Sequence, residues 1–391
     1  MRFPEFHGEW EKHGLSEYLD FKNGLNPDSK RFGKGIKFIS VMDILNNPVI
    51  TYDCIRASVQ ATDAEMSSFS VENGDILFQR SSETLEDVGR ANVYIDDKVA
   101  VFGGFVIRGK KKANYNPLFF RYLLSSPYAR KRIIPMGAGA QHFNIGQEGL
   151  SKVLLNFPSI EEQTKIASLL HLLDERIATQ SKLIEDLKKL KSAIIDYAIN
   201  SLDTDFAKFG SLYEMAGEGG TPTTSNASFY DNGNIPFIKI DDLKQKYLTE
   251  NKDFITELGL QKSSAWLVPT HSILFSNGAT IGEISITTYP VCTKQGILGI
   301  VPKQNIDVEF LYYFMSSSYF KKAVRRIVTE GTMKTAYLKD INNILCPIPT
   351  KEKQQEIAKM PSTLNSKIDF EQSILKLFCS QKQYLLRQMF I

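Results

Sequence analysis

The segment Gly104–Lys111 reads GFVIRGKK and is the part of the chain most similar to a phosphate-binding loop, GxxxxGK[ST]. Such a loop holds phosphates with backbone N–H groups and binds Mg²⁺ through its final hydroxyl side chain. Lys111 occupies that final position, so the hydroxyl is missing, and no convincing helix follows the segment. We therefore do not predict a nucleotide site here.

Other catalytic patterns are also absent from the sequence. It contains no GxSxG or HExxH motif, no CxxC pair, and no NPPY or DPPY motif of an adenine amino-methyltransferase. The histidines show no metal-ligand spacing, and the one inside a long helical pattern is expected on a helix flank: His7, His13, His142, His171 and His271. The sequence thus predicts no catalytic residue, no metal site and no cofactor in this chain.

Composition indicates a cytoplasmic protein of two or three globular domains. The 391 residues exceed one ordinary domain, and 42% hydrophobic with 23% charged residues is typical of folded, soluble chains. No apolar run is long enough for a membrane span, and MRFPEFHGEW lacks the plan of a secretory signal. The four cysteines are scattered, which favours a reducing compartment.

Charge alone does not identify a partner, because the net charge is only +3. Three basic clusters are evident: Lys110–Lys112, Arg130–Arg132, and Lys321-Lys322 with Arg325-Arg326. A solvated surface is the more frequent explanation for any single cluster, and a nucleic-acid contact is the alternative.

A repeat organises the chain. PSIEEQTKIA begins at Pro158 and PTKEKQQEIA begins at Pro349, 191 residues later (349 − 158), with five of ten positions identical. Both copies continue with apolar residues at alternating three- and four-residue steps, which place one stripe on a helix face. The residues that we expect to pair the two helices are Ile166, Leu173, Ile177, Ile184, Leu187 and Ile194 in the first copy, and Ile357, Leu364, Ile368, Leu375, Phe378 and Leu385 in the second.

One position separates the two helices. Leu170 of the first copy corresponds to Pro361 of the second. Proline lacks an N–H group and clashes with the preceding turn, so we predict a kink or break near Met360–Leu364.

The same offset extends upstream of the helices. FFRYLLSS at Phe119 corresponds to FLYYFMSS at Phe310, and both runs are typical of amphipathic helices. Short strands are predicted from runs rich in Ile, Val and Phe: Ile36–Val41, Ile76–Phe78, Val99–Phe102, Ile235–Ile240, Ile273–Phe275, Glu283–Ile286 and Gly296–Val301.

The predicted fold class is therefore α/β, with two tandem pseudo-symmetric units. Each unit is a mixed globular domain followed by a long helix, and the two helices pair as an antiparallel coiled coil. The expected boundaries are residues 1–157 and 204–348 for the globular domains, and 158–203 and 349–391 for the helices. Polar loops such as Gly217–Asn234 and Ser276–Gly282 are candidates for carrying recognition side chains.

These features resemble the specificity subunit of type I restriction–modification systems. A proline followed by E-x-Q-x-x-I-A and a long helix occurs twice, and RFPEFHGEW at Arg2–Trp10 is similar to the start of many such subunits. Gly219–Leu243 resembles the start of a target recognition domain, and ILFSNGATIG at Ile273–Gly282 is similar to that family's sheet-and-loop segment. The first unit departs from the pattern because Arg80–Glu83 replaces the glycine-rich segment.

The resemblance implies a non-catalytic subunit that reads a bipartite site in double-stranded DNA with two target recognition domains. The paired helices would form a spacer and a docking surface for two modification (methyltransferase) subunits. S-adenosylmethionine would be bound there, and restriction subunits would use ATP and magnesium for translocation and cleavage. No membrane partner is implied.

Candidate DNA-binding residues follow from loop position and side-chain type, since Lys and Arg contact phosphates and polar side chains read base edges. In the first unit they are Arg80, Ser81, Lys110, Lys111, Gln141 and Asn144. In the second they are Thr221, Ser276, Asn277, Thr280, Thr332, Lys334 and Tyr337. For each residue alone, an ordinary exposed loop position is an equally good interpretation.

Two other functions remain open at this point. The chain could be a protein–protein adaptor with two binding modules joined by a coiled coil and no DNA role. A tandem-domain enzyme with an unrecognised site is a distant third, because no catalytic constellation is present.

Overall fold

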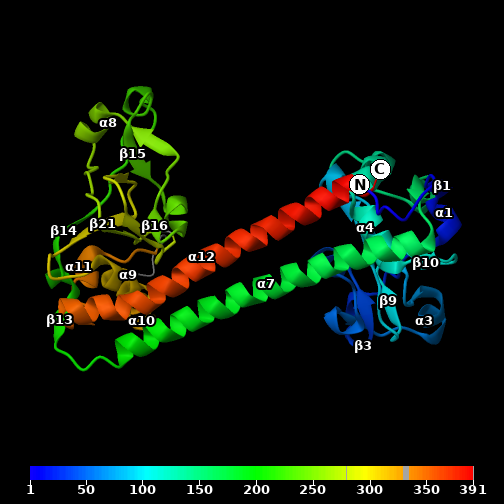
Figure 1. The fold of residues 1–391 in the computed structure, drawn as a ribbon, viewed down its shortest axis with the longest axis horizontal. Coiled ribbons are helices and arrows are strands. Elements are labelled where there is room, and N and C mark those ends of the chain that lie inside the picture. The colour runs from blue at the N-terminus through cyan, green and yellow to red at the C-terminus, as the bar shows by residue number, and fades with distance from the viewer. Residues whose placement is uncertain (279, 329–333, 391) are drawn as a thin grey trace. The chain divides into compact units, whose positions relative to one another are not determined.

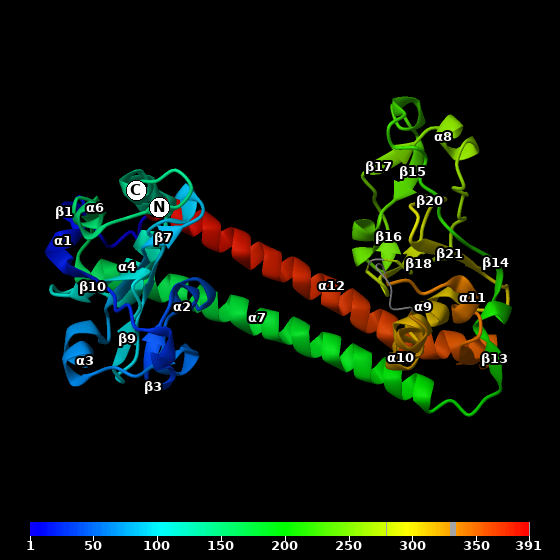
Figure 2. The ribbon, with the colours of Figure 1, turned by 180° about the vertical axis from the view of Figure 1, so that it is seen from behind.

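The computed structural model describes residues 1–278, 280–328 and 334–390. Two compact units make up the chain: unit 1 is Met1–Ser181 with Ser373–Ile391, and unit 2 is Lys182–Gln372. Each unit contains one globular domain and a part of both long helices, α7 (Ile160–Asn200) and α12 (Lys351–Gln388). Both helices are drawn as uninterrupted ribbons in Figures 1 and 2.

The globular part of unit 1 is built on two four-stranded sheets, ordered β2-β10-β6-β8 and β4-β3-β9-β5. The first is antiparallel throughout, whereas the second contains one parallel pair, β3 with β9. Its elements are β1 Glu11–Gly14, α1 Leu15–Tyr18, β2 Leu19–Asn23, β3 Phe32–Ile39, α2 Val41–Asn46, β4 Ser58–Val59, α3 Asp63–Phe69, β5 Ser70–Val71, β6 Ile76–Gln79, β7 Ser81–Ser82, β8 Ala91–Val93, β9 Ala100–Phe102, β10 Val106–Lys111, α4 Pro117–Ser125, α5 Pro127–Ile133, β11 Phe143–Asn144, α6 Gln147–Ser151 and β12 Leu154–Phe157.

Unit 2 repeats this plan with a five-stranded sheet, β14-β21-β18-β19-β16, and a three-stranded sheet, β17-β15-β20. The parallel pair of unit 1 has a counterpart in β15 with β20. The elements are β13 Phe206–Lys208, β14 Tyr213–Glu218, β15 Ile235–Ile238, β16 Tyr247–Leu248, β17 Asp253–Ile255, α8 Glu257–Gln261, β18 Ile273–Ser276, β19 Ile284–Thr287, β20 Cys292–Thr293, β21 Ile297–Pro302, α9 Val308–Ser316, α10 Ser318–Ile327, α11 Leu338–Ile341 and β22 Leu345–Pro347.

The long helices pair antiparallel within each unit. In unit 1, Leu170 near the start of α7 shares a hydrophobic core with Leu385 near the end of α12. In unit 2, Ile199 at the end of α7 shares a core with Ala358 at the start of α12. The predicted α/β class, the tandem repeat and the paired helices are therefore confirmed.

The predicted helix-pairing residues all lie on the sheltered side of their helices. Ile166, Leu173, Ile184, Ile368 and Leu385 are buried. The other seven are half-buried: Ile177, Leu187, Ile194, Ile357, Leu364, Leu375 and Phe378. The pattern missed Ile195 and Ile199, which are also buried and belong to the core of unit 2.

The repeated Gln of the PSIEEQTKIA and PTKEKQQEIA motifs joins each long helix to its globular domain. Gln163 accepts a hydrogen bond from the backbone N–H of Asn116 at 3.1 Å and donates to the carbonyl of Pro158 at 3.0 Å. Gln354 does the same with Asp307 at 2.8 Å and Pro349 at 2.9 Å. Asn116 and Asp307 are the N-cap residues of α4 and α9, so each Gln fixes the start of an amphipathic helix against the long one.

A break at Pro361 does not occur, because α12 runs without interruption from Lys351 to Gln388. Of the predicted kink or break, only the break is excluded. The orange, N-terminal third of α12 changes direction along its axis in Figures 1 and 2, and this third contains Pro361. A proline inside a helix removes one backbone hydrogen bond, which other packing can offset without ending the helix. Pro361 is buried, and the adjacent Ser362 donates to the Glu309 carboxylate of α9 at 2.9 Å, which ties this part of α12 to the globular domain.

Candidate nucleic-acid interface

In unit 1, three predicted residues come together where β6 ends. The short strands β7 and β11 pair so that Ser81 lies opposite Asn144, and the Ser81 hydroxyl donates to Asn144 Oδ1. The backbone N–H of Ile145 donates to the carbonyl of Arg80 at 2.9 Å, which holds this loop against the sheet. Gln141 is exposed in the loop that leads into β11. Arg80, Ser81 and Asn144 therefore form one polar group, which backbone hydrogen bonds hold against the end of the sheet.

Lys110 and Lys111 lie elsewhere. In the β6–β10 pair, Gln79 faces Val106 at one end and Ile76 faces Gly109 at the other, so the two lysines are at the end remote from Arg80. Lys110 forms an ion pair with Glu72 at 3.1 Å. Lys111 Nζ donates to the carbonyl of Tyr115 at 3.2 Å. Lys110 and Lys111 therefore lie apart from Arg80, because the strand that carries them runs away from it.

In unit 2, Ser276 and Asn277 are buried and hold the loops rather than projecting from them. Ser276 Oγ accepts from the N–H of Glu283 at 2.8 Å and donates to the carbonyl of Thr280. Asn277 Nδ2 donates to the carbonyl of Ala336 at 3.3 Å, and the Ala336 N–H donates back to the carbonyl of Asn277 at 2.9 Å. Their predicted role in base contact is corrected to positioning, since neither side chain reaches solvent.

The segment fixed by Asn277 carries two other predicted residues to the surface. Lys334 and Tyr337 flank Ala336, and both are exposed. Thr280 is exposed in the β18–β19 loop, and the Thr221 hydroxyl accepts a hydrogen bond from the N–H of Gln295 at 3.3 Å. Thr332 lies outside the described residues.

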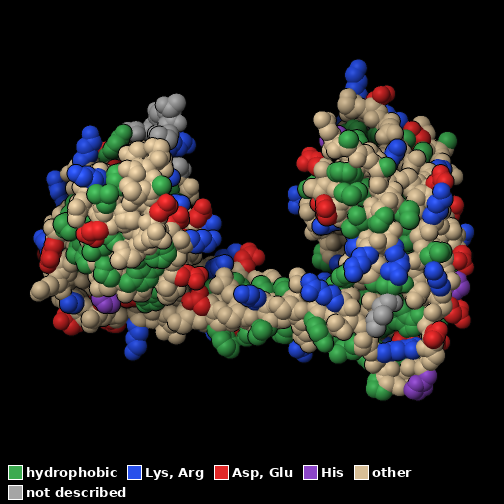
Figure 3. Space-filling model, turned by 90° about the horizontal axis from the view of Figure 1, so that it is seen from above, with side chains coloured by type: hydrophobic (Ala, Val, Ile, Leu, Met, Phe, Trp, Pro, Cys, Tyr) green, Lys and Arg blue, Asp and Glu red, His purple; other side chains and the backbone are tan. Residues whose placement is uncertain are grey.

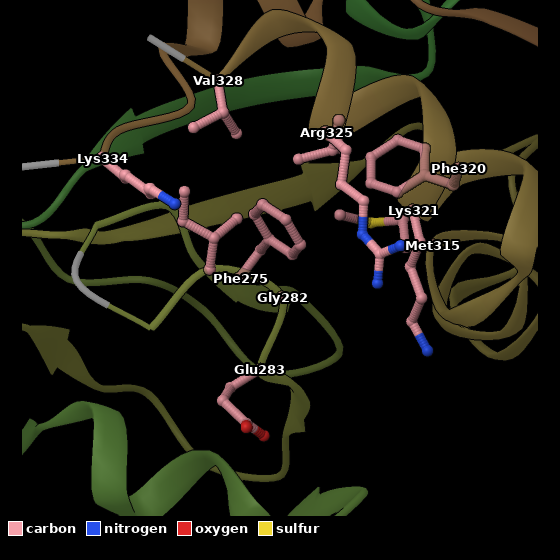
Figure 4. Close-up of a pocket in the computed structure, with 11 residues that line it drawn as sticks. Phe275, Gly282, Glu283, Met315, Phe320, Lys321, Arg325, Val328 and Lys334 are labelled. Atoms are coloured by element: carbon pink, nitrogen blue, oxygen red, sulfur yellow. The ribbon is translucent and has the colours of Figure 1, made fainter. Parts of the chain in front are cut away.

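A cavity of about 580 Å³ adjoins this segment. Its floor is apolar and includes Phe275 and Phe320, while its edge carries Lys321 and Arg325 of α10 together with Lys334. Figure 4 shows Lys334 on the opposite side of Phe275 from the two α10 cations, with the Glu283 carboxylate at a further edge. The sequence identifies Lys321 and Arg325 only as members of a basic cluster and not as site residues. Because they line this cavity, we include them in the candidate site.

The corresponding basic cluster of unit 1 has a structural role. Arg130 donates to the carbonyls of Glu86 at 2.8 Å and Val88 at 2.7 Å, and burial lowers its pKa to about 10. Arg132 stacks on the Tyr128 ring at 3.9 Å. Arg130 and Arg132 therefore make contacts within the domain, and we do not include this cluster in the candidate nucleic-acid interface.

The buried charges in the sheet of unit 1 are also structural. Arg108 lies over the Phe102 ring at 5.4 Å, donates to the carbonyl of Ser70, and has its pKa lowered by burial. Burial raises the pKa of Asp75, which accepts from the N–H of Lys111 at 2.9 Å. The GFVIRGKK segment that contains Arg108 is the strand β10 with its preceding turn, not a phosphate loop.

No cluster of His, Cys, Asp or Glu within the described ranges could hold a metal ion. None of the helices in those ranges is long and apolar enough to cross a membrane. On the face shown in Figure 3, Lys and Arg side chains are mixed with Asp and Glu. The described residues on this face form no large basic surface for binding DNA, so a DNA-binding surface here must be a small group of cations such as Lys321, Arg325 and Lys334.

A family model for the type I restriction modification DNA specificity domain matches the chain twice, at residues 7–189 and 203–377. The chain belongs to the type I restriction–modification DNA specificity family. The two matches coincide with the repeat, and they confirm the family that the sequence resembles.

Two relatives of this specificity chain extend over nearly its whole length. The type I restriction enzyme MjaVIII specificity subunit of Methanocaldococcus jannaschii is 21% identical and covers 94% of this chain and 90% of its own length. The type I restriction enzyme HindI specificity subunit of Haemophilus influenzae is 22% identical, with 83% and 86% covered. Neither name denotes an adaptor or an independent enzyme.

A solved structure supports the fold. The S subunit of a type I restriction–modification system from M. genitalium has a TM-score of 0.58 at 16% identity, covering 100% of this chain and 99% of that one. A chain from a type I R-M complex has a TM-score of 0.63 at 14% identity, with 98% and 97% covered. Both chains are therefore similar in fold to this chain over nearly its whole length.

Proposed function

We propose that this chain is the DNA sequence-specificity subunit of a type I restriction–modification complex and reads a bipartite site with two target recognition domains. The observation that carries this proposal is the presence of two DNA specificity domains, each with its own loop surface fixed at the end of a central strand. The Arg80–Ser81–Asn144 group would read one half-site. Lys334, Tyr337 and the α10 cations would contact the other.

The two surfaces differ, so the two half-sites should differ in sequence. Unit 1 presents Ser and Asn side chains, which read base edges, beside one Arg. Unit 2 presents three cations around an apolar floor, which favours phosphate contact and affinity. An asymmetric bipartite sequence follows from a symmetric scaffold with divergent loops.

The paired helices offer docking surfaces for modification subunits. Exposed apolar side chains recur at seven-residue steps on each helix, which places them on one helix face. They are Leu183, Leu190 and Tyr197 on α7, and Phe370, Leu377 and Tyr384 on α12. Exposed apolar stripes of this kind mark interaction sites. One stripe on each helix suits two modification subunits per chain.

This docking proposal has a direct test. Leu190→Glu puts a charge in the α7 stripe and should abolish co-purification of the modification subunit. Ser192→Glu adds the same charge two residues away, where the residue is exposed and polar, and should leave co-purification intact. Equal loss in both variants would contradict the proposed surface.

Catalysis and cofactors are assigned to partner subunits. The modification subunits would bind S-adenosylmethionine and methylate adenine, and restriction subunits would use ATP and magnesium to translocate and cleave DNA. The family assignment supports this division. The proposed role on chromosomal DNA supports a cytoplasmic location for the complex.

The experiment that tests the proposed function is selection from random duplex DNA by the complex of this chain with its modification subunit. The enriched sequences should contain two short specific blocks separated by a fixed length of unspecified sequence. Enrichment of one continuous block, or of none, would contradict reading by two domains.

A further inference from the structure

Phe105 is an exposed aromatic residue at the tip of a tight turn in unit 1. The Val106 N–H donates to the carbonyl of Gly103 at 2.9 Å, which closes the turn between β9 and β10. Phe105 follows Gly104 in this turn, and 71% of its surface is exposed. Most aromatic side chains of the globular domains are buried or half-buried, so a ring this exposed is a candidate contact residue.

The turn is a rigid support for this ring. The N–H of Arg80 donates to the carbonyl of Phe105 at 2.9 Å, and the N–H of Gly103 donates to the carbonyl of Ile39 at 3.0 Å. A β-carbon on Gly104 would lie 1.8 Å from Oδ1 of the exposed Asn26, so a larger residue at position 104 would displace that side chain. A side chain on a fixed backbone loses little freedom when it binds.

Phe105 lies at the edge of an apolar groove of about 480 Å³. Phe38 forms part of its floor, and Phe32 and Met42 are 43% and 60% exposed at its rim. Phe32 packs edge-on against Phe38, with ring centroids 5.2 Å apart. The groove is therefore an apolar surface of several side chains, not a single exposed ring.

Two basic residues, Arg80 and Lys34, lie beside this apolar surface. Arg80 donates to the carbonyl of Gly104 at 3.2 Å and so lies against the turn. Phe32 and Ile36 both face Val59 across the sheet, so Gly33-Lys34-Gly35 bulges outward with positive φ at both glycines. This bulge exposes Lys34 two residues from Phe32. An apolar surface with cations at its margin is complementary to DNA, in which stacked bases lie between phosphates. Arg80 connects this surface to the neighbouring Ser81–Asn144 pair.

Unit 2 lacks the equivalent side chain. The N–H of Asn277 donates to the carbonyl of Gly296 at 3.0 Å, as that of Arg80 does to Phe105, so Gly296 occupies the position of Phe105. Gly296 has a φ of 90°, which disfavours a side chain there. An exposed ring at this position is thus present in unit 1 and absent from unit 2.

We propose that Phe105 is an aromatic wedge that packs against the bases of the half-site read by unit 1, with Phe32 and Met42 as its apolar flank. The inference rests on the proposed DNA-recognition function and names one residue of that surface. Insertion of an apolar side chain at a base step costs stacking energy that depends on the step, so the wedge would contribute to sequence preference.

The experiment uses the complex of this chain with its modification subunit, and duplexes that carry the selected site or an unrelated sequence. Phe105→Ala should weaken binding to the selected site by about tenfold or more. Binding to the unrelated duplex should change little. Phe105→Leu, which keeps an apolar wedge, should recover most of the affinity. Val99→Ala alters another exposed apolar residue of unit 1, at the opposite end of β9, and should match the wild type.

A second readout locates the contact. Thymines of the unit 1 half-site are replaced singly by 5-iodouracil, and irradiation should crosslink the peptide that contains Phe105. Full affinity of Phe105→Ala with no such crosslink would overturn the inference while leaving the proposed function intact. Loss of the modification subunit from the Phe105→Ala complex would also overturn it, because the ring would then contact protein. A wild-type complex that binds no site would overturn both proposals.

Discussion

Lys191 of α7 donates a hydrogen bond to Asn365 Oδ1 of α12 at 2.8 Å, in the helix pair of unit 2. The equivalent residues in unit 1, 191 positions away, are Lys382 and Asp174, and they form an ion pair (382 − 191 = 365 − 174). The duplicated seam therefore keeps this polar contact in both units, with Asp174 in unit 1 at the position that Asn365 occupies in unit 2. Polar contacts inside a helix seam fix its register, which is the role we assign to both.

The Asp174 contact should make unit 1 acid-sensitive. Burial alone would raise the pKa of Asp174, but hydrogen bonds and charge from Lys382, Tyr122 and Arg121 lower it overall. A carboxyl group with a lowered pKa stabilises the fold above its unfolded pKa of about 4, and this stability is lost as the pH falls below that value. Asp174→Asn should therefore have a smaller loss of thermal stability than the wild type between pH 6 and pH 3.

The control for this prediction is Asp186→Asn, which changes an exposed carboxylate on the same helix. Its melting temperature should follow the wild-type pH dependence. If Asp174→Asn also follows the wild type at every pH, the seam contact contributes no pH-dependent stability and the assignment is wrong.

The repeated Gln should be essential to the junction between helix and domain. Gln354→Ala leaves the N–H of Asp307 and the carbonyl of Pro349 without their partner in a buried place, which costs about 1–3 kcal/mol for each such group. We expect the melting temperature to fall. Gln355→Ala, at the exposed neighbouring position, should have little effect in the same thermal unfolding experiment. Equal melting temperatures for the two variants would contradict this role.

Lys246 should be a buried clamp between the domain of unit 2 and α12. Its side chain is 3% exposed, and its ammonium group pairs with Glu309 and donates to Tyr313 at 2.9 Å and to Ser362 at 3.1 Å. Lys246→Met leaves the Glu309 carboxylate without its cation, and breaking such pairs typically costs about 3–5 kcal/mol. Calorimetry should show a lower unfolding temperature. Lys244→Met, at a position that is 72% exposed, should melt as the wild type does.

The α10 cations should supply salt-dependent affinity. Replacing Lys321 or Arg325 with alanine should weaken DNA binding by the complex on selected and unrelated duplexes alike. The slope of log K against log salt should fall by about one for each phosphate that the protein no longer neutralises. Fluorescence anisotropy at several salt concentrations measures this slope. Lys322→Ala is the matched control, because Lys322 is exposed on α10 and does not line the cavity. An unchanged slope in Lys321→Ala and Arg325→Ala would exclude the cavity from the interface.

The repeat made the architecture predictable from sequence. A fixed offset, an apolar stripe and a proline–Gln motif determine where each long helix starts and which face it buries, because these depend on local periodicity. The sequence could not show that α12 continues through Pro361, since the compensating contacts come from residues distant in sequence. For the same reason the pattern missed Ile195 and Ile199, which pack on the domain of unit 2 rather than on the stripe.

The candidate site was harder to predict, because loop residues look alike in sequence. Ser276 and Asn277 have the side chains of base readers, but the loop geometry turns them inward. In the sequence, Lys321 and Arg325 are typical of a charged helix face. The structure shows that they line the same cavity as Lys334, which lies beyond the end of α10. Phe105 and Lys34 lie next to glycines in the sequence. This pattern indicates a turn and a bulge, but only the structure shows that both side chains lie beside one groove.

We propose that this chain directs adenine methylation to a bipartite DNA sequence. The most direct measurement is methylome sequencing of cells that express the modification subunit with or without this chain. Methylated adenines should appear at one two-part sequence only when the chain is present, and replacing the loop surface of one unit should change only one part of that sequence. A methylome that is the same with and without the chain would show that this chain does not direct methylation.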